Sequence, residues 1–301
     1  FNNVGDIQEA QGELQAALIS YRDSLAINQR LAAIDPTNTQ RQRDLSVSFN
    51  NVGDIQEAQG ELQAALISYR DSLAINQRLA AIDPTNTQRQ RDLSVSFNNV
   101  GDIQEAQGDR QAALTSYRDS LAIRKRLAAT DPTNTQRQRD LSVSFDNIGS
   151  IQEAQGELQA ALTSYRDSLA IAQKLAAIEP TNTQWQRDLS VSFNNVGDIQ
   201  EAQGELQAAL ISYRDSLAIN QRLAAIDPTN TQRQRDLSVS FNNVGDIQEA
   251  QGDRQAALTS YRDSLAIRKR LAATDPTNKQ WQRDLSISQQ NVAKTLPQIN
   301  Q

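Results

Sequence analysis

The side chains that could do chemistry in this 301-residue sequence are carboxylates, which recur in pairs three residues apart. Asp102 and Glu105 form one such pair, and the pair returns at a constant spacing along the chain, with an exception at Ser150. On a helix, this arrangement puts both carboxylates on one face, where they could form an acid–base couple or hold a divalent cation. The sequence contains no His, Cys or Met and therefore offers neither an imidazole base nor a thiolate ligand.

Several features argue against catalysis. No histidine is present to activate a serine, and no glycine-rich phosphate-binding loop occurs. A catalytic site is expected to be unique in a chain, whereas every candidate here occurs five or six times. The paired acids are predicted to face solvent rather than to form a buried couple with displaced pKa values. We therefore expect no catalytic residue, no resident metal or cofactor, and a protein that is not an enzyme.

The elements that position these acids are repeats. The stretch that begins Phe97-Asn-Asn-Val-Gly101 returns from Phe1, Phe49, Phe145, Phe193 and Phe241. A fixed period of this kind marks a stacked array, in which each unit contacts its neighbours. We predict one array over 1–301, made of repeats 1–48, 49–96, 97–144, 145–192, 193–240 and 241–288, with a polar capping helix within 278–296. Because the pattern begins part-way through at Phe1, we expect a fragment of a longer protein.

Each repeat is predicted to be a helical hairpin. The Asp-Pro step at Pro84 ends one helix, and either Thr85 or Asn86 caps the next. Apolar positions at three- and four-residue steps then predict a helix of about 21 residues, the A helix, which ends at Gly108. A second helix of about 22 residues, the B helix, runs to the next Asp-Pro step at Pro132.

A glycine inside the predicted A helix needs an explanation. Gly101 costs about 1 kcal/mol relative to alanine in a helix. Ala113 lies on the predicted B-helix face that should meet it, so we expect a close crossing of the two helices at these residues. The same glycine recurs in every repeat.

These residues resemble a known family. Phe97-x2-Val100-Gly101 followed by Ala113-x3-Tyr117 is similar to the tetratricopeptide repeat pattern, and the long spacing is similar to the repeats of kinesin light chains and bacterial scaffolds. The resemblance implies an all-α, right-handed α-α superhelix. Gln104 and Ser120 depart from the pattern and are expected to weaken the contact within a repeat slightly. Each repeat exceeds the usual tetratricopeptide length by about 14 residues, which are expected to lengthen both helices rather than the loops.

The resemblance also implies that the A helices line a concave face that binds a peptide or a partner domain. On a helical wheel with Val100 turned toward the B helix of its own repeat, Asn98, Asp102, Glu105 and Arg91 fall on the stripe turned away from it. Stacking repeats turns this stripe into rows, and rows of amides could pair with an extended backbone. The predicted binding residues are Asn2, Asn50, Asn98, Asn194, Asn242, Asp6, Asp54, Asp102, Asp198, Asp246, Glu57, Glu105, Glu153, Glu201, Arg43, Arg91, Arg139, Arg187 and Arg235.

The acidic rows favour a basic or mixed-charge protein or peptide. The net charge of −6 disfavours nucleic acid and anionic membranes. No apolar run is long enough to span a bilayer and no signal peptide is visible, so a cytoplasmic location is expected. Two alternatives stay open: a solvated lining in which Arg and Asp pair between layers, and self-assembly of the array into a filament or layer.

Three local changes in the sequence complete the predictions. In repeat four, Asp146 stands in place of the row asparagine and Ser150 in place of the row aspartate, which reflects either altered specificity or sequence drift. The basic triplet 124–126, which recurs at 268–270, is predicted to lie on the solvated outer face of a B helix, with a nucleic-acid role as the weaker alternative. Trp185 and Trp281 are predicted to pack on the end of a B helix rather than to stack on a ligand.

Overall fold

The computed structural model describes the backbone of residues 2–299 and the side chains of residues 3–296. Within that range the chain forms thirteen α-helices and no strand. The A helices are α1 (Asn2–Ala10), α3 (Thr39–Ala58), α5 (Thr87–Ala106), α7 (Thr135–Ala154), α9 (Thr183–Ala202), α11 (Thr231–Ala250) and α13 (Lys279–Ile299). The B helices are α2 (Leu14–Ile34), α4 (Leu62–Ile82), α6 (Arg110–Thr130), α8 (Leu158–Ile178), α10 (Leu206–Ile226) and α12 (Arg254–Thr274).

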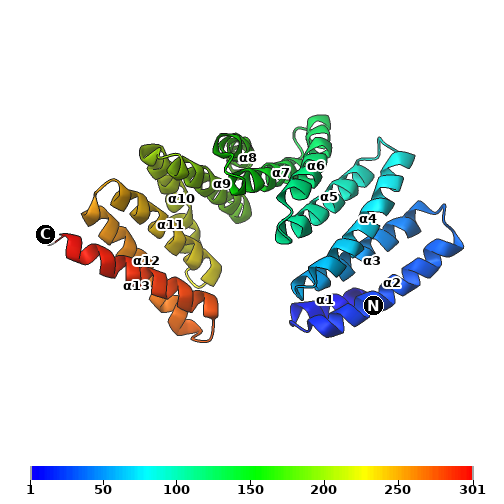
Figure 1. Cartoon of the computed structure of the whole chain (residues 1–301), viewed down its shortest axis with the longest axis horizontal. Helices are drawn as coiled ribbons and strands as arrows, with labels where there is room; N and C mark the ends of the chain where they lie inside the picture. Colours follow the sequence, from blue (N-terminus) through cyan, green and yellow to red (C-terminus); the bar gives the residue numbers. More distant parts are fainter. Residues whose placement is uncertain (1, 300–301) are drawn as a thin grey trace. The chain divides into compact units, whose positions relative to one another are not determined.

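The chain divides within α7 into two compact units, unit 1 (residues 1–151) and unit 2 (residues 152–301). In each unit, every helix packs against the helix before it and the helix after it (Figure 1). The predicted helix-turn-helix repeat is confirmed at its predicted spacing, as is the lengthening of both helices. A single array over the whole chain, and its handedness, remain predictions.

Local side chains set the helix ends. Asn86, rather than Thr85, is the N-cap of α5, and its Oδ1 accepts a hydrogen bond from the Arg89 backbone N–H. At the other end, Gly108 has a φ of +83°, the left-handed conformation predicted for it. The Asp109 N–H donates to the Gln104 carbonyl and the Gly108 N–H to the Glu105 carbonyl, both at 2.8 Å, which completes a Schellman turn.

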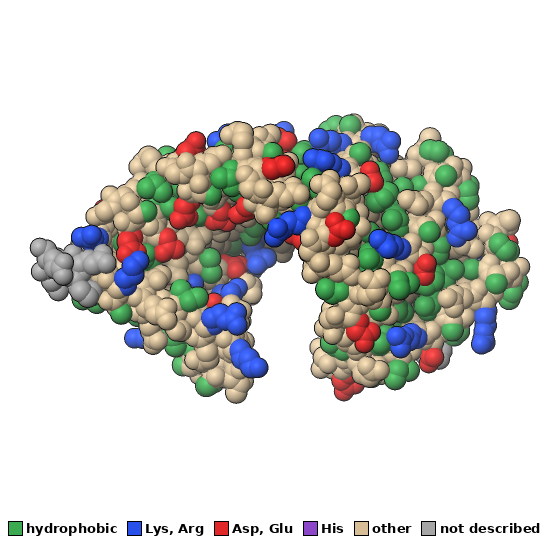
Figure 2. All heavy atoms as spheres, viewed as in Figure 1, with side chains coloured by type: hydrophobic (Ala, Val, Ile, Leu, Met, Phe, Trp, Pro, Cys, Tyr) green, Lys and Arg blue, Asp and Glu red, His purple; other side chains and the backbone are tan. Residues whose placement is uncertain are grey.

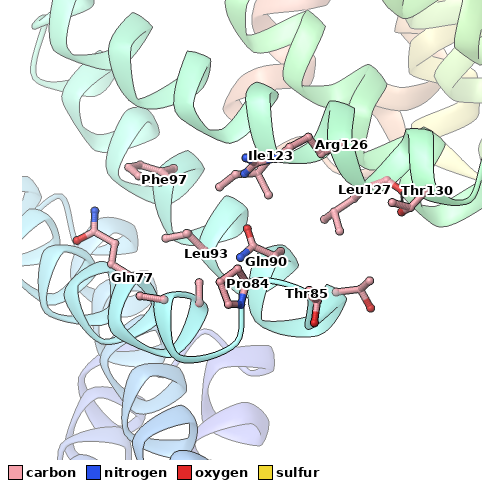
Figure 3. A pocket seen from close by; sticks show the side chains of 13 residues that line it. Gln77, Pro84, Thr85, Gln90, Leu93, Phe97, Ile123, Arg126, Leu127 and Thr130 are labelled. Atoms are coloured by element: carbon pink, nitrogen blue, oxygen red, sulfur yellow. Dashed lines mark hydrogen bonds between the residues drawn. The ribbon is translucent and has the colours of Figure 1, made fainter.

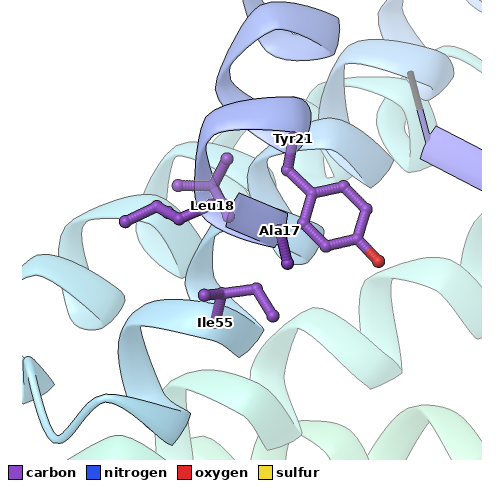
Figure 4. Packing of buried hydrophobic residues seen from close by; sticks show 5 residues of the cluster. Ala17, Leu18, Tyr21 and Ile55 are labelled. Atoms are coloured by element: carbon purple, nitrogen blue, oxygen red, sulfur yellow. The ribbon is translucent and has the colours of Figure 1, made fainter. Parts of the chain in front are cut away.

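Two different B helices contact each A helix between α1 and α13. Val100 and Ile103 of α5 join a buried cluster with Leu66 and Tyr69 of the preceding repeat's α4. The corresponding cluster between α2 and α3 contains Ala17, Leu18, Tyr21 and Ile55 (Figure 4). The buried apolar clusters therefore join successive repeats, whereas Gly101 and Gln104 of the same predicted face meet the B helix of their own repeat.

The helical glycine faces a tyrosine and not the predicted alanine. A Cβ built on Gly101 would lie 2.7 Å from the Cε1 of Tyr117, which is closer than packed atoms approach. Ala113 instead belongs to the cluster with Ile148 and Ile151 of the next A helix. The glycine therefore makes room for an aromatic ring, which explains why its helix-propensity cost is tolerated.

The departures from the family pattern form hydrogen bonds in this chain. The Ser116 hydroxyl donates to the buried Gln104 Oε1 at 2.7 Å, and the Ser120 hydroxyl donates to the Ser94 carbonyl at 2.9 Å. Buried polar groups that are paired in this way carry little desolvation penalty. The contact within a repeat is therefore partly polar at these positions.

The last helix, predicted to be a polar cap, exposes both polar and apolar side chains, among them Ile287 at 42% and Leu296 at 38%. Ser288 and Thr295 of α13 are buried on its inner side, whereas Gln289, Gln290 and Ala293 are exposed. The role of α13 as a cap remains a prediction.

Candidate functional site

Tyrosine hydroxyls connect the paired acids of the A helices. The Tyr117 hydroxyl of α6 donates to Asp102 Oδ1 at 2.7 Å and lies 2.9 Å from Glu105 Oε2 of α5. One hydroxyl carries one proton, so it cannot fully satisfy two ionised carboxylates. The same arrangement, with distances of 2.6–2.7 Å and 2.9–3.0 Å, occurs at Tyr21 with Asp6 and Glu9, Tyr69 with Asp54 and Glu57, Tyr213 with Asp198 and Glu201, and Tyr261 with Asp246 and Glu249.

Neighbouring acids from successive A helices face one another. In unit 1, burial is the main cause of the raised pKa values of Asp54 and Asp102, and the charge of Glu9 raises the first further, as that of Glu57 does the second. We call these rows the acidic ladder: Asp6, Glu9, Asp54, Glu57, Asp102 and Glu105 in unit 1, and Glu153, Asp198, Glu201, Asp246 and Glu249 in unit 2. The predicted rows of Asp and Glu are therefore brought together by the structure.

The ladder carboxylates reach solvent but are partly desolvated. Burial by surrounding atoms is the main cause of the raised pKa of Asp198, followed by the repulsion of Glu153 and Glu201, and the Tyr213 hydroxyl opposes both. The pKa of Asp198 rises to about 6 as a result. The same causes raise the pKa of Asp246, although Arg268 lowers it in part. The ladder thus carries negative charge that its own surroundings do not fully compensate.

Each unit ends its ladder with a substitution. In unit 1, Ser150 stands one repeat after Asp102, and its hydroxyl donates to Glu105 Oε1 at 3.5 Å. In unit 2, Lys294 stands one repeat after Asp246, and its ammonium lies 3.5 Å from Glu249 Oε1. An ammonium group placed at this position of the ladder therefore meets a carboxylate of the preceding layer.

The arginine row has a structural role. Arg91 Nε of α5 donates to Asp140 Oδ2 of α7 at 2.8 Å. Equivalent ion pairs join Arg43 to Asp92, Arg187 to Asp236 and Arg235 to Asp284. Arg139 also has an interaction partner. The sequence left pairing between layers as the alternative to ligand binding, and these four ion pairs confirm it. They also show that the A helices they join are direct neighbours.

The asparagine row is less exposed than predicted. Asn98 and Asn242 are only 7% and 6% exposed, so neither amide is presented to solvent. Asn50 and Asn194 are half-buried, and the Oδ1 atom of each has no hydrogen-bond partner among the described residues. The side chain of Asn2 lies outside the described residues. Of the predicted binding residues, the acids are therefore the ones that offer unsatisfied charge to a ligand.

The basic triplet is not uniformly on the outer face. Arg124 is 6% exposed and donates to the Asp140 carbonyl at 2.8 Å and to the Ser144 hydroxyl at 3.0 Å. Arg268 is buried in the same way. Placing these two arginines on a solvated surface was wrong, because acceptors on the next A helix satisfy them. Lys125 is exposed, with its ammonium 5.0 Å from the centre of the Phe145 ring.

Both tryptophans are half-buried at the starts of A helices. The backbone N–H groups of Trp185 and Trp281 donate to the N-cap side chains of Asn182 and Asn278. At the equivalent position, Arg89 donates to the carbonyl of Leu79 at the end of a B helix. The packing of the Trp185 and Trp281 rings on a B helix remains a prediction.

Among the described residues, no three His, Cys, Asp or Glu side chains converge in a way that could hold a metal ion. None of the helices described is both long and apolar enough to cross a bilayer.

The sequence did not reveal the tyrosine bridges or the Lys294 contact. The tyrosine could have been linked to the acids from its fixed offset, 15 residues after the Asp and 12 after the Glu. The change from Asp246 to Lys294 at equivalent positions was visible in the sequence, but the pairing of Lys294 with Glu249 was not.

Comparisons with known proteins agree with this architecture. Models of the tetratricopeptide repeat family match residues 94–132, 144–177 and 238–276. A search of curated proteins returned no match. Among solved structures, the chain is similar to BtubC (BKLC) from P. vanneervenii, with 21% identity and a TM-score of 0.68 over 86% of this chain and 92% of that one.

Two further structures share the fold at low identity. TPR-like repeats of a putative kinesin light chain from Podosopora anserina match with 19% identity and a TM-score of 0.52, covering 76% of this chain and 95% of that one. The apo form of RapI matches with 14% identity and a TM-score of 0.56, covering 90% of this chain and 97% of that one.

Proposed function

We propose that this chain, three stretches of which match tetratricopeptide repeat models, is an interaction scaffold whose acidic ladder binds a basic, extended segment of a partner protein. The observation that carries the proposal is the uncompensated charge of the ladder. Desolvation and mutual repulsion raise the pKa values of Asp54, Asp102, Asp198 and Asp246, and a cationic ligand would relieve both effects.

The contact of Lys294 supports the choice of a cationic ligand. Its ammonium occupies, in α13, the ladder position that Asp246 holds in α11, and it pairs with Glu249. A lysine or arginine of a partner could pair with Glu57 or Glu201 in the same manner. Arginine would add directional hydrogen bonds to the charge.

The spacing of the layers suggests a register for the ligand. The ion pairs Arg43–Asp92 and Arg91–Asp140 make α3, α5 and α7 direct neighbours, and neighbouring helices lie about 8–10 Å apart. An extended or polyproline II chain rises about 3.1–3.4 Å per residue. Three ligand residues therefore span one layer, and we propose a basic residue at every third position.

A peptide-binding experiment tests this proposal. Two fluorescent peptides of identical composition would carry lysine either at every third position or in one contiguous block. We expect the spaced peptide to bind more tightly in fluorescence anisotropy at low salt, and binding to weaken as salt rises. The variant Asp54→Asn/Asp102→Asn should bind the spaced peptide several-fold more weakly.

The matched control changes two exposed acids of the B helices. Asp71→Asn/Asp119→Asn removes the same net charge from α4 and α6, outside the ladder. Equal weakening by both double variants would show that only the overall charge matters, and the ladder would lose its assigned role. Equal binding of the two peptides would refute the register alone.

Self-association is a second candidate, favoured by apolar side chains on the B helices. Ile19 and Ile67 are 55% and 54% exposed at equivalent positions of α2 and α4, and Ile34 and Ile82 are 75% and 65% exposed at the ends of these helices. Figure 2 shows apolar side chains among charged ones of both signs on the face in view. Light scattering would reveal concentration-dependent assembly. The double variant Ile19→Thr/Ile67→Thr should abolish assembly, because it removes two of the exposed apolar side chains. The variant should still fold, because Thr115 occupies the same position in α6.

A further inference from the structure

An apolar cavity of about 700 Å³ lies in unit 1, and none of the ladder residues lines it. The end of α4, the first half of α5 and the second half of α6 line it, and it is open to solvent on one side. Leu93, Phe97, Ile123, Leu127 and Pro84 supply its apolar wall (Figure 3). A concave, mainly apolar site of this size with a few polar groups is typical of small-molecule binding.

The polar groups of the cavity give it a positive character. Arg126 is exposed, and its guanidinium has no hydrogen bond or ion pair with any residue the structure describes. No acidic side chain lines the cavity, so Arg126 is the one charged group among the lining residues. An unpaired guanidinium beside an apolar wall is suited to a carboxylate on an apolar body.

Gln90 adds an amide donor. At equivalent positions, Gln138 donates to the Ala128 carbonyl at 3.5 Å and Gln234 donates to the Ala224 carbonyl at 3.4 Å. The Gln90 amide makes no such bond within the described residues, and its side chain lies among the lining groups in Figure 3. Its N–H groups are therefore available to a ligand in the cavity.

Part of this lining recurs in unit 2, where the acidic Asp263 is also among the lining residues. Two adjoining cavities there, of about 330 and 380 Å³, share Ile267 and Arg270. These two residues stand three repeats after Ile123 and Arg126, in a stretch of identical sequence. The site is therefore continuous in unit 1 and divided in unit 2, where the amide of Gln234 is already bonded to the Ala224 carbonyl.

We propose that these cavities bind an amphiphile with an apolar body and one carboxylate, such as a medium-chain fatty acid. The apolar body lies against Leu93, Phe97 and Leu127, and the carboxylate accepts hydrogen bonds from Arg126, with Gln90 as a second donor. The ligand differs from the basic segment proposed for the ladder, so the two sites act independently.

Isothermal titration calorimetry with decanoate, below its micelle-forming concentration, tests the proposal on the full chain. Decanol, which has the same chain without the charge, is the matched ligand. We expect up to two molecules of decanoate per chain and at least fivefold weaker binding of decanol. Arg126→Gln/Arg270→Gln should reduce decanoate affinity about fivefold and leave decanol affinity unchanged.

Arg118→Gln/Arg262→Gln is the control, because these arginines are exposed on the same helices and do not line the cavities. We expect this variant to bind decanoate like the parent chain. Circular dichroism would show that both variants keep their helices. Equal affinities for decanoate and decanol, equal losses in both double variants, or no binding of decanoate would each overturn the proposal.

Discussion

Replacing Asp198 by asparagine should stabilise the protein at neutral pH. Burial and the neighbouring Glu153 and Glu201 raise the pKa of Asp198 from its ordinary 3.8 to about 6. The asparagine would keep an oxygen acceptor for the Tyr213 hydroxyl, which donates to Asp198 Oδ1 at 2.6 Å, while removing the charge. The substitution therefore isolates the electrostatic cost of this carboxylate.

The magnitude follows from the size of the pKa shift. Each pKa unit corresponds to about 1.4 kcal/mol, so the full shift would cost about 3 kcal/mol above pH 6. Because Asp198 is exposed on one side, solvent screening reduces this, and we expect about 1 kcal/mol. Between about pH 4 and 6 the folded state binds more protons than the unfolded state, so stability falls as pH rises through this window.

Urea denaturation at two pH values measures this effect. At pH 7.5 we expect Asp198→Asn to be about 1 kcal/mol more stable than the parent chain, and at pH 4 the difference should fall to about half or less. Asp215→Asn, an exposed acid of α10 outside the ladder, should change stability by less than about 0.5 kcal/mol at pH 7.5. A destabilised Asp198→Asn variant, or a gain of the same size at pH 4, would refute the electrostatic reasoning.

Three further predictions rest on particular contacts. Gly101→Ala should lower stability by about 1–3 kcal/mol in thermal unfolding, since the new Cβ meets the Tyr117 ring at 2.7 Å; a higher melting temperature would contradict that packing. Arg91→Gln should cost less than about 1 kcal/mol and less at high salt, because its pair with Asp140 is partly exposed; a loss above about 2 kcal/mol would mean that the pair is more than a surface contact. Lys294→Ala should strengthen binding of the lysine-spaced peptide, because Glu249 loses its internal counter-ion; unchanged or weaker binding would argue against Lys294 as a stand-in for the ligand.

The helices could be predicted closely because the residues that end them act locally. Asn86 caps α5 by accepting a hydrogen bond from the backbone N–H of Arg89, three residues later. Gly108 ends α5 because glycine adopts the left-handed backbone conformation without strain. The position of the acidic rows also followed from helical periodicity, because Asp102 and Glu105 lie on the stripe that the apolar residues leave free.

The contacts between helices could not be predicted in the same way. A helical wheel shows which residues share a face, but not that this face would meet two B helices, with Val100 in a cluster of the preceding repeat and Gly101 against its own. Gly101 was matched with Ala113 by size, whereas the structure uses its missing side chain to admit the Tyr117 ring. Arg124 was expected in solvent because of its charge, and its burial depends on acceptors from a different repeat.

The most direct measurement of ligand binding on the acidic ladder is zero-length carbodiimide cross-linking of the lysine-spaced peptide, read out by mass spectrometry. This reaction joins a lysine amine only to a carboxylate in contact with it. We predict cross-links to ladder acids of α3, α5, α9 and α11, among them Glu57, Asp102 and Glu201. Cross-links confined to B-helix acids such as Asp71 and Asp119, or none in a peptide that binds, would contradict the account.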